Sequence, residues 1–417
     1  MRTRGAALVA LLLAVAAASG SARAGETGGA PDDRTGEPPR AGEEPIVELY
    51  TMGQGDDIFE KFGHAAMCIR YTRQPRRTRC YNYGSTDFDS VVPLFWGFLR
   101  GRSVFWVSVS SRARMLEYYR ESDRSIWRQV LDLPPDRAHA LADALAHDSR
   151  EENRYYDYHH YKDNCSTRLR DHLDRVTGGA LSAAAREPSR HGSYRDISRR
   201  GFAGDTGILL VSDLILGRET DREPDNFEAM FLPDVLRSEV EARLGARPEL
   251  VYTRRGPPFS GDPGLGGRWF WLLLAALFAA PLALSRAVWR GRRERAAIAA
   301  AAIPLALVGL VLWTLAIASP LPEVRWNEVL LVFMPWDLAL IALGPDRRRR
   351  YARARAAELV LVSLLRAVGL LRQPLWLLIP IPLAAMVLVA IARRDRDPAI
   401  APAEVGSEAA TPPVAGS

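Results

Sequence analysis

The chain has 417 residues, a formal net charge of +6 and 25% charged residues, so it is long enough for more than one domain. Its arginines gather beside apolar segments, as they do at membrane ends, and this pattern excludes nucleic-acid binding as the origin of the basic charge. The sequence has three cysteines, seven histidines and no Cys-x-x-Cys or His-x-x-x-His spacing, so we expect neither a bound metal nor a cofactor.

The N-terminus has the three parts of a secretory signal peptide. Arg2 and Arg4 precede an apolar run over residues 6–18, and small residues follow it. We therefore expect residues 1–24 to be a cleaved signal peptide. Residues 25–45 are mostly Gly, Pro and charged side chains with little to bury, so they are predicted to form a disordered leader.

A globular domain is predicted over residues 46–253. Alternating apolar runs indicate strands, whereas capping residues followed by apolar residues three and four apart indicate helices. The expected strands are residues 47–51, 64–71, 79–84, 103–110 and 126–133. The expected helices are a short one over 57–62, one that begins at Pro135 and one from near Cys165 to Gly178. This mixture favours an α+β fold over a parallel sheet.

A linker over residues 254–268, rich in Gly and Pro, leads to a predicted membrane domain over residues 269–392. About five spanning helices are expected, at residues 269–285, 296–318, 326–343, 356–371 and 375–392. Arginine clusters follow the first, third and fifth segments. The positive-inside rule therefore predicts a multi-pass protein of the bacterial inner membrane, with the globular domain in the periplasm and a disordered tail, residues 393–417, in the cytoplasm.

The three cysteines divide into a pair and a single thiol. Cys68 and Cys80 lie symmetrically in a predicted hairpin, where either a disulfide or simple cross-strand packing fits the spacing. Cys165 is the odd thiol in both cases. It follows the capping residues Asp163 and Asn164, so it is predicted to lie at a helix N-terminus.

The N-H groups and dipole of a helix N-terminus lower the pKa of a thiol and can hold the oxyanion of a tetrahedral intermediate. Cys165 is accordingly a candidate nucleophile. The alternative is a buried, inert cysteine that packs as a small apolar side chain.

A thiol nucleophile needs a base, and His64 is the leading candidate because it begins a predicted strand after Gly63. If Cys68 faces Cys80, then Asn82 is the diagonal neighbour of His64 on the same side of the sheet, where an amide can hold an imidazole in the required tautomer. Among the other histidines, His160 follows an aromatic run that can equally line a pocket.

Three sequence blocks resemble the periplasmic domain of the Lnb-type lipoprotein N-acyltransferases, over roughly residues 46–236. The blocks are Gly53-Gln54-Gly55-Asp56 with Phe62-Gly63-His64-Ala65, Tyr81-Asn82-Tyr83-Gly84, and Asp163-Asn164-Cys165-Ser166-Thr167-Arg168. The resemblance implies a papain-like thiol fold in circularly permuted order, similar to lecithin-retinol acyltransferases. It also implies that Cys165 is the nucleophile and His64 the general base.

The expected function is acyl transfer from a phospholipid or lipoprotein ester, through a Cys165 thioester, to the N-terminal amine of a lipoprotein. Tyr156, Tyr158, His160 and Arg168 are the candidate substrate-binding residues. Two alternatives remain open at this point: an envelope cysteine peptidase or amidase, and a non-catalytic envelope scaffold.

Overall fold

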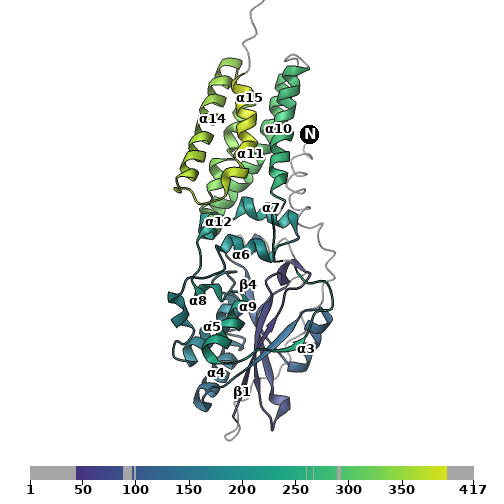
Figure 1. The fold of residues 1–417 in the computed structure, drawn as a ribbon, viewed down its shortest axis with the longest axis vertical. Helices are drawn as coiled ribbons and strands as arrows, with labels where there is room; N and C mark the ends of the chain where they lie inside the picture. The colour runs from purple at the N-terminus through teal and green to yellow at the C-terminus, as the bar shows by residue number, and fades with distance from the viewer. Residues whose placement is uncertain are drawn as a thin grey trace, which may run out of the picture.

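The structure is a computed structural model, and it describes residues 44–87, 96–97, 100–259, 261–265, 267–288 and 293–391. An α/β domain and a helical bundle lie end to end, with helices α6 and α7 between them (Figure 1). The predicted signal peptide, all but the last residues of the leader, and the predicted tail lie outside the described residues.

The α/β domain is built on one antiparallel sheet of seven strands in the order β6-β4-β3-β2-β1-β5-β7. The strands are β1 (Ile46–Met52), β2 (His64–Arg70), β3 (Arg79–Ser85), β4 (Val104–Ser110), β5 (Ile126–Leu131), β6 (Tyr155–Asp157) and β7 (Glu249–Tyr252). All five strands predicted from the sequence are therefore confirmed, and a mixed α and β domain is confirmed with them.

Helices cover both faces of this sheet. The helices before the bundle are α3 (Arg112–Glu121), α4 (Pro135–Asp148), α5 (Cys165–Val176), α6 (Tyr194–Gly201), α7 (Thr206–Ile215), α8 (Asn226–Ala229) and α9 (Pro233–Leu244). The short 3-10 turns are η1 (Ile58–Glu60), η2 (Pro75–Arg77), η3 (Ser182–Arg186) and η4 (Arg218–Asp221). The predicted helices at Pro135 and Cys165 are present, and the one expected over residues 57–62 is the single turn η1.

Strand β2 shows how the two faces are divided. Its odd-numbered residues, such as Met67, belong to a core shared with α4, α5 and α9, whereas Ala66 and Cys68 belong to a second core that includes Met115 and Tyr119 of α3. Successive side chains of a strand point to opposite faces, so both faces of β2 are packed. A side chain can therefore reach solvent or substrate only where the strand ends.

The hairpin of β2 and β3 is closed by a disulfide. Cys68 and Cys80 are direct partners in the antiparallel register and are bonded to each other, so the disulfide is confirmed and simple cross-strand packing is excluded. Both cysteines are fully buried against the α3 side of the sheet. Cys165 is the one cysteine outside a disulfide.

Replacing the disulfide by Cys68→Ala with Cys80→Ala is expected to lower the free energy of unfolding by about 3 kcal/mol, because the unfolded chain loses the constraint of a short closed loop. The measurement is the thermal midpoint of the full chain in detergent. The same midpoint for the variant and the non-reduced wild type would contradict a stabilising role.

The C-terminal part is a bundle of α10 (Trp269–Ala287), α11 (Glu294–Ala318), α14 (Pro345–Ala367) and α15 (Pro380–Ala390) (Figure 1). Shorter turns connect them, namely α12 (Pro322–Arg325), η5 (Glu328–Leu331), η6 (Pro335–Leu338), α13 (Ala339–Ala342) and η7 (Leu375–Leu377). Within the described chain, α10 and α11 are the two helices long and apolar enough to cross a membrane. The prediction of about five spanning helices is therefore wrong.

The other three predicted spans fail for separate physical reasons. A spanning helix needs about 20 mainly apolar residues. Residues 326–343 are split into short turns, and prolines at the start of η6 and α14 begin new helices there. Helix α14 ends at Ala367, so it contains only residues 356–367 of the predicted span 356–371, and its earlier turns carry the arginines of residues 347–350. Helix α15 has only 11 residues.

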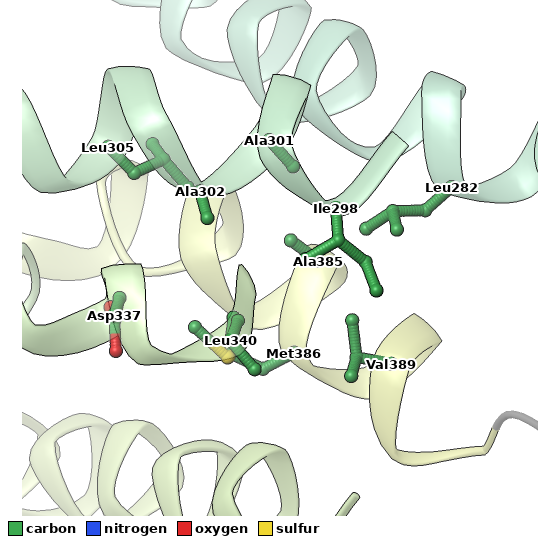
Figure 2. A pocket seen from close by; sticks show the side chains of 10 residues that line it. All are labelled: Leu282, Ile298, Ala301, Ala302, Leu305, Asp337, Leu340, Ala385, Met386 and Val389. Atoms are coloured by element: carbon green, nitrogen blue, oxygen red, sulfur yellow. The ribbon is translucent and has the colours of Figure 1, made fainter. Parts of the chain in front are cut away.

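A buried ion pair holds the broken segment inside the bundle. The carboxylate of Asp337 on η6 accepts hydrogen bonds from Tyr351 Oη at 2.6 Å and from Arg355 Nε at 3.2 Å. Asp337 also borders a small cavity that is otherwise lined by apolar side chains of α10, α11, α13 and α15 (Figure 2). Because both charges are almost fully buried, each depends on the other for its stability in this position.

The bundle is docked onto the α/β domain through several polar contacts. The backbone N-H of Gly217 donates to the carbonyl of Glu323 at 2.6 Å, and Asn327 Nδ2 donates to the carbonyl of Leu214 at 2.7 Å. The ammonium of Lys162 lies 3.0 Å from the Glu323 carboxylate. These contacts fix the end of the domain that carries α6 and α7 against the base of the bundle, in addition to the predicted linker.

Candidate functional site

The free thiol begins helix α5. Asn164 caps this helix: its side-chain oxygen accepts hydrogen bonds from the N-H groups of Ser166 and Thr167, both at 2.9 Å, and Thr167 Oγ1 accepts one from the Asn164 N-H in return. This reciprocal capping box satisfies two of the free N-H groups of the first turn, and the N-H of Cys165 is not one of them. Cys165 is partly exposed.

The charged residues at either side of the cap hold the turn in place. Arg168 donates from Nε and Nη2 to the two carboxylate oxygens of Asp163, at 2.5 and 2.8 Å. Asn164 Nδ2 donates to the carbonyls of His160 and Phe231. The Cys165 sulfur makes only a long contact with a side chain of this block, 4.0 Å from Ser166 Oγ, and it is outside any disulfide.

His64 reaches the site from the opposite face of the sheet. It is the first residue of β2, and its ring stacks on Tyr119 of α3 with the centroids 5.8 Å apart. A side-chain interaction with Asn82 raises the pKa of His64, against the larger effect of burial. Nevertheless, Nε2 of His64 and Oδ1 of Asn82 are both buried without a hydrogen bond of normal geometry. The two residues therefore lie together, as the hairpin register predicts, but are not aligned for a strong hydrogen bond.

The thiol lies against the backbone of β2, next to the residue that follows His64, where the pairing of β2 with β3 ends. This pairing covers only three residues on each strand, from Met67 with Tyr81 to Ile69 with Arg79. Beyond it, the N-H of Ala65 donates to the thiol of Cys165. Gly84 has φ 90°, which favours glycine, and a Cβ added there would lie 3.6 Å from Cys165 Cβ. The gap between the strands thus admits the start of α5.

Burial sets the charge state of the resting site. It raises the pKa of the Cys165 thiol above its usual value, and the hydrogen bonds from Ala65 and Ser166 oppose this shift only in part. Burial and the nearby positive charge of Arg124 lower the pKa of His64 to about 3. The expectation that the helix N-terminus produces a thiolate is therefore wrong for the resting structure, in which the thiol and the imidazole are both neutral.

One further residue near His64, Arg124, was not found from the sequence. Arg124 is 3% exposed; its Nε donates to the Gly53 carbonyl and its Nη1 to the Glu60 carboxylate, and it lies 5.0 Å from the centre of the Tyr119 ring. Gly55 leaves no room for a Cβ beside Glu60, which explains a glycine in this block. The signal for Arg124 was weak, because it is one arginine among many between two predicted strands.

The four predicted substrate-binding residues do not share one position. Tyr156 lies beside Gly84 and under the guanidinium of Arg168, which is 4.1 Å from its ring centre. Tyr158 stacks on Phe105 at 4.2 Å, and the charge of Cys165 influences its pKa, so it lies near the thiol. His160 packs in an aromatic cluster, and burial lowers its pKa to about 4. Its ring neighbours are Phe62, Tyr161 and Phe231.

The described cavities are not at this site. One lies in the bundle (Figure 2), and the other is lined by residues around Leu131, Arg137, Val176 and Leu244. In the part of the chain that the structure describes, no group of three or more His, Cys, Asp and Glu side chains has the arrangement of a metal site.

The sequence blocks that build this site match a known family. The family model of the Lnb N-terminal periplasmic domain matches residues 44–200. No curated protein and no solved structure matches the chain. The resemblance drawn from the three sequence blocks is confirmed for this domain.

The matched Lnb N-terminal periplasmic domain contains the whole candidate site, since His64, Asn82, Tyr156 and Cys165 all fall within it. The folded α/β domain continues beyond the match. Helix α9 packs on the core of the sheet, and β7 pairs with β5 at its edge. The structural domain of this chain is thus longer than the matched region.

Proposed function

We propose that the chain is a membrane-anchored, cysteine-dependent acyltransferase of the bacterial envelope, with Cys165 as nucleophile and His64 as general base. The observation that supports this proposal is the one free thiol, at a capped helix N-terminus, which accepts a hydrogen bond from the N-H of Ala65, the residue after His64. The Nε2 of His64 is buried and has no hydrogen-bond partner, so it is available to accept a proton during the reaction.

The reaction has two steps. In the first, the Cys165 sulfur attacks the carbonyl carbon of an ester, His64 takes the thiol proton, and the leaving alcohol receives that proton as the thioester forms. In the second, an amine attacks the thioester, His64 takes one amine proton, and the C-S bond breaks as the amide forms. The leaving Cys165 sulfur then receives that proton from His64, which restores the thiol. A phospholipid or lipoprotein is the proposed donor, and the N-terminal amine of a lipoprotein is the proposed acceptor.

Asn82 has the proposed role of orienting His64. Asn82 lies next to His64 on the same face of the sheet, which supports this role. Its interaction with the ring raises the pKa of His64, and this favours the imidazolium that forms during the reaction. The order of the elements, with the histidine strand before the cysteine helix, supports a circularly permuted papain-like arrangement. The antiparallel sheet packed against α5 fits the same arrangement.

The position of the site near the bundle supports a lipid substrate. His159 follows the strand of Tyr156, and its Nε2 lies 3.6 Å from the carboxylate of Glu323 in α12. Phe62, just before His64, contacts Phe202 at 5.0 Å, shortly before α7. Helix α7 in turn packs on the bundle core through Leu214. The reactive end of the sheet is thus the end that faces the bundle, where an acyl chain from the membrane would arrive.

The arginines support a periplasmic location for the α/β domain and a cytoplasmic one for the C-terminus. Arg286 ends α10, and Leu282, Ile298 and Val389 line one cavity, so the end of α10, the start of α11 and the end of α15 lie together (Figure 2). This arginine-rich end of the bundle lies away from the α/β domain (Figure 1). By the positive-inside rule, we propose that this end faces the cytoplasm.

The test is mass spectrometry of the purified full chain after incubation with phospholipid vesicles. We expect one acyl group on the peptide that contains Cys165, and its loss on treatment with hydroxylamine, which cleaves thioesters. Addition of a lipopeptide with a free N-terminal amine should then yield the acylated amine. Release of free fatty acid without amide would favour a hydrolase, and an unmodified Cys165 with every phospholipid and lipopeptide ester would contradict the proposal.

A further inference from the structure

Tyr156 presents an unpartnered phenol to the reactive thiol. It belongs to β6 and is 9% exposed, yet its Oη is buried without any hydrogen-bond partner in the structure. A buried hydroxyl that lacks a partner costs free energy, of the order of 1–3 kcal/mol. Such a donor is expected where a ligand or an intermediate supplies the missing acceptor.

The position of this phenol is defined by Gly84. A Cβ added to Gly84 would lie 4.0 Å from Tyr156 Oη and 3.6 Å from Cys165 Cβ, so the glycine leaves a space that borders both residues. The negative charge of a Cys165 thiolate raises the pKa of Tyr156 further, after burial, which agrees with this short separation. The phenol therefore remains protonated and able to donate while chemistry takes place at the sulfur.

The ring of Tyr156 is held by the same helix that carries the thiol. The guanidinium of Arg168 lies 4.1 Å from the ring centre and is fixed by its two hydrogen bonds to Asp163. One turn of α5 thus places Cys165 and holds Tyr156. The cation over the ring face also makes the phenol a better hydrogen-bond donor, because it withdraws electron density from the ring.

We infer that Tyr156 Oη, together with the uncapped N-H of Cys165, forms the oxyanion hole of the site. This inference rests on the proposed acyl transfer. When the sulfur bonds to the ester carbon, the carbonyl π electrons move to the oxygen, and the Tyr156 O-H donates a hydrogen bond to it. When the C-O bond to the alcohol breaks, that electron pair re-forms the carbonyl and the alcohol leaves with the proton from His64. No proton leaves Tyr156.

The test compares two reactions of the same thiol in the full chain. Acylation by p-nitrophenyl octanoate passes through an oxyanion and is followed by release of p-nitrophenolate. Alkylation by iodoacetamide forms no oxyanion and is followed by mass spectrometry of the Cys165 peptide. For Tyr156→Phe we expect acylation to slow by about 10²- to 10³-fold, with the alkylation rate unchanged within about twofold.

Tyr155→Phe is the matched control. Tyr155 is the neighbouring residue of β6, is 47% exposed, and donates its hydroxyl proton to Glu151, so its loss should leave both reactions unchanged. Tyr156→Phe should also fold with an unchanged or higher thermal midpoint, because the phenol that it removes has no partner.

Two results would overturn the inference and leave the proposed function standing. The first is an equal acylation rate in Tyr156→Phe and the wild type. The second is an equal loss of acylation and alkylation in Tyr156→Phe, because this would indicate a disturbed thiol instead of a lost oxyanion donor. A wild-type chain whose Cys165 is alkylated but never acylated overturns the proposed function, and the inference with it.

Discussion

Cys165→Ser is expected to reduce acyl transfer by at least about 10⁴-fold, to the background of the uncatalysed reaction. A serine hydroxyl is far less acidic than a thiol, and burial at this helix end already raises the pKa of the cysteine. His64 alone is then too weak a base to activate the hydroxyl. The measurement is formation of acyl-amine from a phospholipid donor and a lipopeptide acceptor, with the thermal midpoint as the check on folding.

The matched control for this variant is Cys68→Ala with Cys80→Ala, which removes the other two sulfurs and retains Cys165. The control should lose stability and keep its activity, whereas Cys165→Ser should keep its stability and lose activity. The reverse result, an inactive but well-folded double variant beside an active Cys165→Ser, would mean that the nucleophile has been assigned to the wrong cysteine.

His64→Ala is expected to slow the acylation of Cys165 by about 10²- to 10⁴-fold at neutral pH, the usual contribution of a general base. The pH dependence should change as well. Since the pKa of His64 is lowered to about 3, the imidazole is a free base throughout pH 5 to 8, and wild-type acylation should be nearly independent of pH there. Without His64, only the thiolate reacts, and the rate should rise about tenfold per pH unit.

The measurement is the burst of p-nitrophenolate from p-nitrophenyl octanoate between pH 5 and pH 8, corrected for spontaneous hydrolysis. His139→Ala is the control, because His139 lies on α4 and outside the site. A His64→Ala profile that is flat and only a few-fold below the wild type would remove His64 from the role of base. A wild-type rate that falls steeply below pH 7 would mean that the imidazole titrates near its ordinary pKa.

The local parts of the site follow from the sequence, because short-range patterns specify them. Asn164 and Thr167 stand three residues apart before an apolar helical face, and this spacing is enough to place Cys165 at a helix N-terminus. The symmetrical positions of Cys68 and Cys80 predict the register of the hairpin, and that register places His64 and Asn82 on one face.

The membrane part was predicted less well, because apolar composition does not specify helix continuity. The segment over residues 326–343 is apolar enough for a span, yet prolines and the buried Asp337 divide it into turns that pack against neighbouring helices. Helix α3 was not predicted at all. Its sequence is largely polar, with few apolar residues on its buried side, and its packing on the sheet is a long-range property.

The sequence by itself determined the type of domain, the cap that presents the thiol and the pairing that carries the candidate base. Only the tertiary structure decided that the thiol lies against the Ala65 backbone, beside the point where β2 and β3 separate, and that the His64 ring stacks on Tyr119 of α3. It also decided their charge, since the dipole and N-H groups of a helix end act locally, whereas desolvation depends on everything packed around the thiol. Three side chains come to the site from segments that are distant in the sequence, namely Arg124, Tyr119 and Tyr156. No local sequence pattern predicts that they lie close together.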